Sequence, residues 1–296
     1  MCIRDRFGFA GALVIGGPVS GALLEMHGIG GLKGWEWMFL IEGAMAVVVG
    51  IWAFFVIVDR PHAAKWLAPA EQDALQAVLD QEAAQKAAGS PQTVMQTLRN
   101  PKVMFFALNF FIVQIAAYGL IFYLPSQVSQ ILGQKIGLMV GFVTSIPWLL
   151  ALFVVFFVTR WSDRHHERRR LTVASLYTVF GVCVCLSAHG SPIFAIAALS
   201  IGASTWLSGT PIFFAFLSER LSGLGIAAGI ALVNSIGNLG GFVAPSLRTY
   251  VEQNHGGSAA GLYTLGGAAL LAALMLALMP SCLLYTSDAA DEGLGV

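Results

Sequence analysis

The stretch from Ile226 to Leu247, IAAGIALVNSIGNLGGFVAPSL, is an apolar run long enough to cross a lipid bilayer. It nevertheless carries two carboxamide side chains, Asn234 and Asn238, in its middle. Helical spacing places both on one face, whose other residues are small or polar. Hydrocarbon offers no hydrogen-bond partner, so an amide exposed to lipid is strongly unfavourable. Both Asn side chains are therefore predicted to face protein or a water-filled cavity.

Two interpretations of this helix remain open at this point. The Asn side chains can tie neighbouring helices together, with Gly237 and Gly241 forming a G-x-x-x-G pair that permits close backbone approach. Alternatively, the two amides line the path of a polar substrate through the membrane. The rest of the chain has to decide between packing and binding.

The composition predicts a membrane protein. Of 296 residues, 57% are hydrophobic and only 11% are charged, and the mean hydropathy is +0.75. A water-soluble domain of this size needs more charge on its surface. The formal net charge is zero, so the total charge says nothing about partners, and we expect a lipid bilayer and no nucleic acid around the chain. We expect an all-α polytopic helical bundle in a lipid bilayer.

Eight apolar segments have the roughly 20 residues that a bilayer requires. These predicted spans are residues 7–24, 38–58, 103–124, 138–159, 171–188, 192–217, 226–247 and 261–279. A surface helix is predicted near 70–88, within the polar segment 59–102. Lys and Arg concentrate after spans two, four and six. The positive-inside rule therefore predicts that loops 59–102, 160–170 and 218–225 are cytoplasmic.

Both ends of the chain look unrelated to the rest. MCIRDR at residues 1–6 and CLLYTSDAADE at residues 282–292 resemble translated sequencing adapter. We expect residues 1–6 and 281–296 to be non-native and the natural chain to be longer, and we exclude both ends from the fold argument.

Charge inside the spans is nearly absent. Glu42 is the one carboxylate clearly within a span, and it is either a carrier of protons or cations or a structural hydrogen-bond acceptor near a helix end. No span is predicted to hold His, Lys or Arg at depth, since Arg248 and Glu252 are assigned to a polar loop. The sequence has no nucleophile–base pair and no metal-ligand spacing. We therefore expect no catalytic residues, no metal and no cofactor.

Neutral polar and aromatic side chains remain on three spans. They are Gln114, Tyr118 and Phe122 on the third, Thr210 and Phe214 on the sixth, and Asn234, Ser235 and Asn238 on the seventh. Such groups can line a cavity near the membrane midplane for a small polar solute. This set favours a transporter. A membrane-embedded enzyme and a structural membrane protein without transport activity are the alternatives.

The segment after the fourth span is sharply basic. Asp163 can pair there with Arg164, Arg168 or Arg169, which would form a latch that opens and closes as two halves of a transporter rock. A simple positive-inside anchor explains the same arginines, and both interpretations remain open.

Several motifs resemble the major facilitator superfamily. WSDRHHERR at 161–169 is similar to that family's G-x-x-x-D-R-x-G-R-R loop, although Thr159 and His166 replace its glycines. Three stretches are similar to the anion:cation symporter branch, which includes tartrate-, phthalate- and hydroxyphenylacetate-type permeases. They are GWEWMFLIEG at 34–43, VDRPHAAKWL at 58–67 and AAGIALVNSIGNLGGFVAP at 227–245.

The resemblance implies that the eight spans are helices 5–12 of twelve. Residues 7–58 would then be the last two helices of the N-terminal half, 59–102 the loop between the halves, and 103–280 the six-helix C-terminal half. It further implies proton-coupled uptake of a small organic anion, a carboxylate, by alternating access. The protein would reside in the inner membrane, and we expect a monomer.

The resemblance also implies where the substrate binds. Polar groups of helices 7 and 11 line the site in the family, and these map onto Gln114, Tyr118 and Asn234. Asn234 is thus expected to face the substrate, and Asn238 to be a packing contact or a partner of the binding residues. The charged residues that such symporters use for the carboxylate and the proton commonly lie on helices 1 and 4, which would precede Phe7. This chain alone is therefore expected not to transport.

Overall fold

The computed structural model describes residues 3–58, 60–64, 66–88, 99–189, 191–221, 225–254 and 256–279. Within these ranges all regular structure is helical, which confirms the all-α prediction. The predicted non-native tail, 281–296, lies outside the described residues, as do Met1 and Cys2. The α-helices are α1 (Ile3–Glu25), α2 (Gly34–Val56), α3 (Pro69–Ala88), α5 (Pro101–Leu132), α6 (Leu138–Arg164), α7 (Arg169–Leu186), α8 (Pro192–Ser218), α9 (Gly225–Asn254) and α10 (Gly257–Ala277), with short 3-10 turns η1 (Ile29–Gly31), η2 (Pro61–Ala63) and η3 (His166–Arg168).

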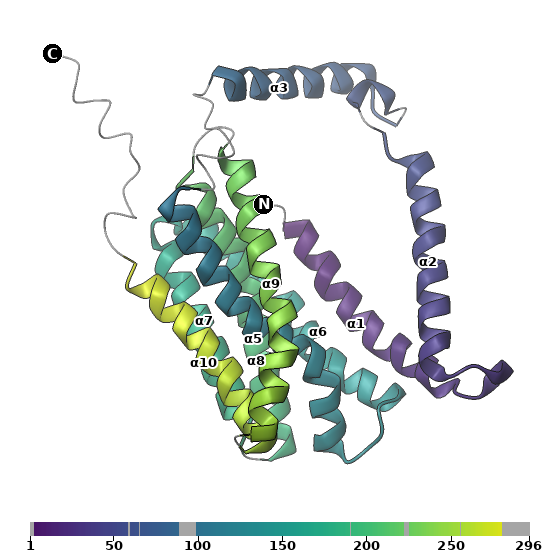
Figure 1. The fold of residues 1–296 in the computed structure, drawn as a ribbon. Helices are drawn as coiled ribbons and strands as arrows, with labels where there is room; N and C mark the ends of the chain where they lie inside the picture. Colours follow the sequence, from purple (N-terminus) through teal and green to yellow (C-terminus); the bar gives the residue numbers. More distant parts are fainter. Residues whose placement is uncertain are drawn as a thin grey trace.

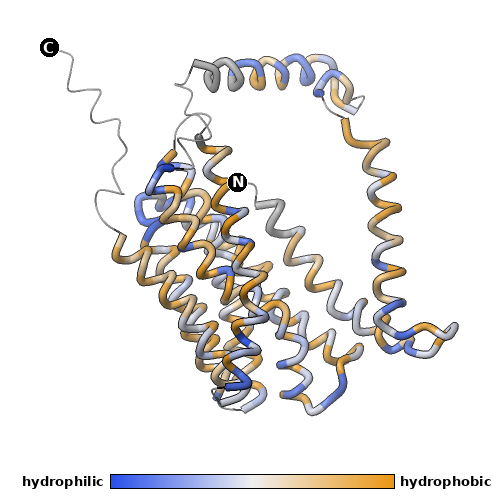
Figure 2. The backbone as a smooth tube through the Cα atoms, viewed as in Figure 1, coloured by the Kyte–Doolittle hydropathy of each residue, from blue (hydrophilic) through white to orange (hydrophobic). Residues whose placement is uncertain are grey.

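All of these α-helices except α3 are long and apolar enough to cross a membrane, which confirms the eight predicted spans. Figure 2 shows hydrophobic residues along the spans and hydrophilic residues in α3 and at the bundle ends. Helix α3 lies across one end of the molecule, roughly perpendicular to the spans (Figure 1). We call this end, where α6 and α8 finish and α5 and α9 begin, the basic end, because it carries residues 160–170.

Several helices run past their predicted ends. Asn100 caps α5 by accepting a 2.9 Å hydrogen bond from the backbone N–H of Lys102, and the helix continues through Pro125 to Leu132. Helix α6 continues to Arg164, and α9 to Asn254. The predicted loop positions of Asp163 and Arg248 are therefore wrong. Arg, Glu and Gln are good helix formers, so a helix does not stop where its apolar run stops.

Helices α5 to α10 pack into one bundle with a continuous apolar core. Helix α5 lies against α9 and α10, α7 lies between α8 and α10, and α6 lies against α8 (Figure 1). Phe106, Phe110 and Phe213 are fully buried at the centre, where Phe110 and Phe213 stack at 5.3 Å. This aromatic cluster fixes α5 against α8, and so positions the polar residues beside it.

Helix α1 joins this bundle through glycines. A Cβ atom added at Gly17 would lie 2.8 Å from the carbonyl oxygen of Gly141, and one at Gly21 would lie 2.6 Å from that of Gly137. Glu25 also accepts a 2.7 Å hydrogen bond from the backbone N–H of Leu138, at the start of α6. The contact of α1 with α6 is thus made backbone to backbone. We call it the glycine seam.

Helix α2 stands apart from the bundle in Figure 1. Beyond Gly34 its side chains are half-exposed or exposed, including Phe54 and Phe55. Ser20 on α1 donates a 2.6 Å hydrogen bond to the half-buried carboxylate of Glu42 on α2. A helix with this apolar surface suits a hydrocarbon environment.

Candidate functional site

A small cavity lies midway along the bundle, between α5, α8 and α9. We call it the central cavity; its volume is about 120 Å³. It is lined by Phe9, Phe110, Gln114, Tyr118, Ile121, Trp206, Thr210, Phe214, Asn234 and Asn238. The structure thus brings together Gln114, Tyr118, Thr210, Phe214, Asn234 and Asn238, which the sequence had grouped across three spans.

Glycines on α9 create this meeting of helices. A Cβ atom added at Gly240 would lie 2.5 Å from the carbonyl oxygen of Phe111, and one at Gly241 would lie 2.7 Å from the Tyr118 ring. No larger residue fits at either position without movement of α5. The close approach expected from the glycine spacing is therefore present, and it sets Asn238 directly beside Tyr118.

The amides of the central cavity differ in their hydrogen bonds. Tyr118 Oη donates to Asn238 Oδ1 at 3.0 Å, and Gln114 Nε2 donates to the same oxygen at 3.5 Å. Asn234 is exposed and makes no hydrogen bond to the described part of the chain. Gln114 Oε1 is buried and has no partner among the described residues. Asn238 is thus held in place by two hydrogen bonds. The Asn234 amide and the side-chain oxygen of Gln114 have no hydrogen-bond partner among the described residues.

Helix α8 contributes polar residues whose hydroxyl groups bond to their own helix. Thr210 Oγ1 donates to the carbonyl of Trp206 at 3.0 Å, and Ser208 Oγ to that of Ser204 at 2.7 Å. Such bonds satisfy a hydroxyl donor inside a membrane helix. The bond of Thr210 uses the donor of its hydroxyl and not the acceptor lone pairs, and Phe214 supplies an apolar wall of the cavity.

Two predicted residues do not line the central cavity. Phe122 is exposed, and its ring lies 5.5 Å from that of Tyr118. Ser235 is also exposed. Their assignment to a binding site stays a prediction.

Four lining residues were not predicted from the sequence: Phe9, Phe110, Ile121 and Trp206. Trp206 was detectable, since it forms an i, i+4, i+8 stripe with Thr210 and Phe214 on one face of α8. Its buried indole Nε1 has no hydrogen-bond partner among the described residues. The other three residues carry no polar group, so only the packing reveals them.

Comparison with known proteins identifies the family. The model of the Major Facilitator Superfamily matches residues 6–245. The chain belongs to the Major Facilitator Superfamily. It is 42% identical over 265 residues to the inner membrane transport protein RhmT of Escherichia coli, covering 90% of this chain and 61% of that protein. It is 37% identical to a putative tartrate transporter of Agrobacterium vitis, covering 88% of this chain and 60% of the relative.

A quinolone resistance transporter of Acinetobacter baumannii is 33% identical, over 86% of this chain and 58% of the relative. The chain of this major facilitator protein thus spans about three fifths of the length of these curated relatives. All three are membrane transporters and not enzymes, which agrees with the expectation drawn from the sequence. Among the described residues, no group of three or more His, Cys, Asp or Glu side chains is placed to hold a metal ion.

One buried charge on α9 was not predicted from the sequence. Arg248 of this major facilitator chain is 1% exposed within α9. Its Nε donates to Glu252 Oε1 at 2.6 Å, its Nη1 donates to the carbonyl of Gly119 at 3.5 Å, and its guanidinium lies 4.0 Å from the centre of the Tyr123 ring. Arg248 is thus buried within the helix of the seventh span, whereas the sequence had assigned it to a polar loop. The i, i+4 spacing of Arg248 and Glu252 was the available signal.

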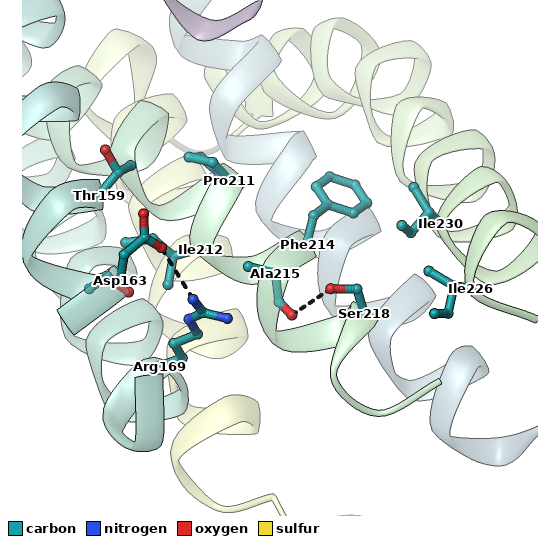
Figure 3. Close-up of a pocket in the computed structure, with 11 residues that line it drawn as sticks. Thr159, Asp163, Arg169, Pro211, Ile212, Phe214, Ala215, Ser218, Ile226 and Ile230 are labelled. Carbon is teal, nitrogen blue, oxygen red and sulfur yellow. Dashed lines mark hydrogen bonds and ion pairs between the residues drawn. The ribbon is translucent and has the colours of Figure 1, made fainter. Parts of the chain in front are cut away.

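The predicted latch residues lie at the basic end. Arg169 Nη2 donates to Asp163 Oδ1 at 3.2 Å (Figure 3), and Arg169 also bonds Glu219 just beyond α8. Glu219 was not predicted. Arg164 is exposed, and Arg168 lies 3.9 Å from Glu167 at the surface, a separation that contributes little. The half-buried Arg169 thus joins α6, α7 and the end of α8.

Glu42, the predicted intramembrane acid, is not among the lining residues of the central cavity.

Proposed function

We propose that this chain forms part of a secondary transporter that takes up a small organic anion together with a proton by alternating access. One observation carries the proposal: three amides and a phenol from α5 and α9 meet α8 at one cavity within the bundle. Gln114 Oε1 is buried there without a partner among the described residues, and an unpaired polar atom costs free energy in an apolar interior unless a solute or water pairs with it.

The lining of the central cavity supports a polar solute with hydrogen-bonding groups. Asn234 and Gln114 Oε1 supply a free amide and a free acceptor, while Trp206 and Phe214 supply apolar walls. Among the described residues that line the cavity there is no Lys or Arg, and we place the group that balances the charge of an anion elsewhere in the full-length protein. Relatives named as putative tartrate transporters suggest the carboxylate class.

The arrangement in the membrane is part of the same proposal. We place the protein in the inner membrane, the location in the name of the RhmT relative, with the basic end on the cytoplasmic side, because residues 160–170 hold five Arg residues. Asp163 and Arg169, joined by Glu219, then form a cytoplasmic latch that breaks and re-forms during transport.

The test is uptake of radiolabelled carboxylates by cells that express the full-length protein. Asn234→Ala and Gln114→Ala are compared with Gln130→Ala, an exposed amide on α5 that serves as the matched control. We expect the first two variants to lower kcat/KM by about tenfold or more, because each hydrogen bond to a charged solute is worth ~1.5–3 kcal/mol. Wild-type uptake in both variants would refute the binding role of this cavity.

Proton coupling is measured separately in the same cells. Addition of substrate to a lightly buffered suspension should make the medium more alkaline if a proton enters with the anion. A quinolone is included as a competitor, because one relative is named a quinolone resistance transporter. Competition by the quinolone and none by tartrate would reject a tartrate-like solute.

A further inference from the structure

Three cavities follow one another along the bundle. A cavity of about 550 Å³, the basic-end cavity, lies between the ends of α6 and α8 and the start of α9 (Figure 3). The central cavity lies midway along the same helices. A third cavity of about 340 Å³, the glycine-lined cavity, lies between α1, α5 and α6, where Gly17, Gly21, Gly137 and Gly141 form part of its wall.

The order of the cavities follows from helix direction. Ile226 and Ile230 at the start of α9 line the basic-end cavity, whereas Asn234 and Asn238 line the central one. On α5, which runs away from the basic end, the central cavity reaches Ile121 and the glycine-lined cavity reaches Pro125. The sequence of cavities therefore runs from the basic end to the opposite end of the bundle.

Each pair of neighbouring cavities shares one wall residue at its junction. Phe214 lines both the basic-end cavity and the central cavity. Ile121 lines both the central cavity and the glycine-lined cavity. The two side chains are large and apolar, so they separate the central cavity from the space on either side.

Phe214, which borders the central cavity on the side of the basic end, lies close to a proline within α8. Phe214 is 2% exposed, and its ring packs edge-to-face on Phe110 at 4.9 Å. Pro211, three residues earlier on α8, also lines the basic-end cavity. Proline lacks the N–H that would bond to the carbonyl of Leu207, which weakens α8 just before Phe214.

Ile121, which borders the central cavity on the opposite side, also lies close to a proline in its own helix. Ile121 lies four residues before Pro125 on α5, so its own carbonyl loses the usual helical partner. Ile121 is half-buried and is not held in the aromatic cluster. Both side chains thus sit at points where their helices bend more easily than elsewhere.

We propose that the three cavities are successive sections of a single solute path, and that Phe214 and Ile121 are the side chains that close it on the two sides of the binding site. This inference rests on the proposed transport function. It assigns Phe214 to the barrier toward the basic end and Ile121 to the barrier toward the opposite end. A small hydrophilic solute passes each barrier only when the side chain moves aside.

The experiment measures access to the central cavity instead of transport. Thr210→Cys is introduced as a reporter into the full-length protein, with the native cysteines replaced by Ser. A membrane-impermeant thiol reagent is added to right-side-out or inverted vesicles, and the labelling rate is followed. A separate Arg168→Cys variant, exposed in the basic segment, identifies which vesicle preparation presents the basic end.

Phe214→Ala should speed labelling of the reporter from the basic end by about tenfold, which corresponds to ~1.4 kcal/mol off the barrier, and leave the other side unchanged. Ile121→Ala should do the reverse. The matched controls are Phe242→Ala and Ile201→Ala, which remove exposed side chains of the same types from α9 and α8. The controls should label at the rate of the reporter alone.

Ile121→Trp serves as a second variant, because a larger side chain should slow labelling from the end opposite the basic end. Equal acceleration from both sides in Phe214→Ala or Ile121→Ala would overturn the proposal, as would no change in either variant. The labelling result is independent of the solute. Side-specific labelling combined with no carboxylate uptake by the wild type would reject the proposed substrate while the barriers stand.

Discussion

Tyr118 on α5 donates a 3.0 Å hydrogen bond to the side-chain oxygen of Asn238 on α9. The bond crosses the interface between the two helices at the wall of the central cavity. It orients the Asn238 amide, and with it one side of the proposed binding site. In the proposed site Tyr118 would therefore act on a solute both through its own position and through Asn238.

Removing this bond should weaken solute binding by a measurable amount. We expect Tyr118→Phe to raise the KM for uptake, since a neutral hydrogen bond contributes ~0.5–1.5 kcal/mol. A double-mutant cycle with Asn238→Ala isolates the pair, and the two effects should be less than additive. Strict additivity of Tyr118→Phe and Asn238→Ala would show that the bond plays no part in binding.

The glycines of α9 yield a stability prediction. Gly241→Ala should destabilise the protein by ~1–3 kcal/mol, because the new methyl group collides with the Tyr118 ring. Gly267→Ala on α10 is the matched control, since its Cβ meets no atom within 4 Å. The control should be neutral or stabilising, because Ala is the better helix former. Thermal unfolding in detergent measures both, and equal midpoints for the two variants would contradict the tight contact.

The ion pair of Arg248 and Glu252 on α9 leads to a third prediction. Arg248→Met leaves Glu252 without its partner, but the Glu252 side chain is 25% exposed, so we expect a loss smaller than the ~3–5 kcal/mol of a fully buried pair. The double variant Arg248→Met/Glu252→Met should regain part of that loss, because no unpaired charge remains. Arg160→Met, at an exposed position, is the control and should change stability by less than ~0.5 kcal/mol. Unfolding in detergent is the measurement, and a double variant less stable than Arg248→Met would contradict the account.

The proposed latch is tested at Arg169. Because this residue bonds both Asp163 and Glu219, we expect Arg169→Met to slow initial uptake several-fold at unchanged protein level. Glu219→Gln, which keeps the shape but removes the charge, should have a smaller effect in the same direction. Arg160→Met again serves as the control. An uptake rate in Arg169→Met equal to that of the control would favour the simple anchor interpretation of the basic segment.

The sequence predicted the spans and most of the central cavity because both depend on local signals. Apolar length alone indicates a span, and i, i+4 spacing placed Gln114 and Tyr118 on one face. The grouping of α5, α8 and α9 around one solute was inferred from their neutral polar residues. The structure places six of those residues at one cavity.

The features that could not be predicted from the sequence depend on tertiary contacts. Arg248 was assigned to a loop because hydropathy ends at Leu247, while its burial depends on Gly119 and Tyr123, far away in sequence. Glu219 joins Arg169 only because α8 ends beside the start of α7. Ile121 has no polar atom, and only the shape of the packed bundle reveals that it borders two cavities.

The glycine seam between α1 and α6 has a mechanical consequence. Helices that interlock by side chains must change rotamers, or separate, before they can shift. At Gly17, Gly21, Gly137 and Gly141 no side chain interlocks, and two hydrogen bonds tie the helices together there: Glu25 accepts from the N–H of Leu138, and Ser145 Oγ donates to the carbonyl of Val14. A displacement of α1 along α6 therefore requires these two bonds to break and no rotamer change at the four glycines. A bulky residue at any one of the four positions would act as a wedge.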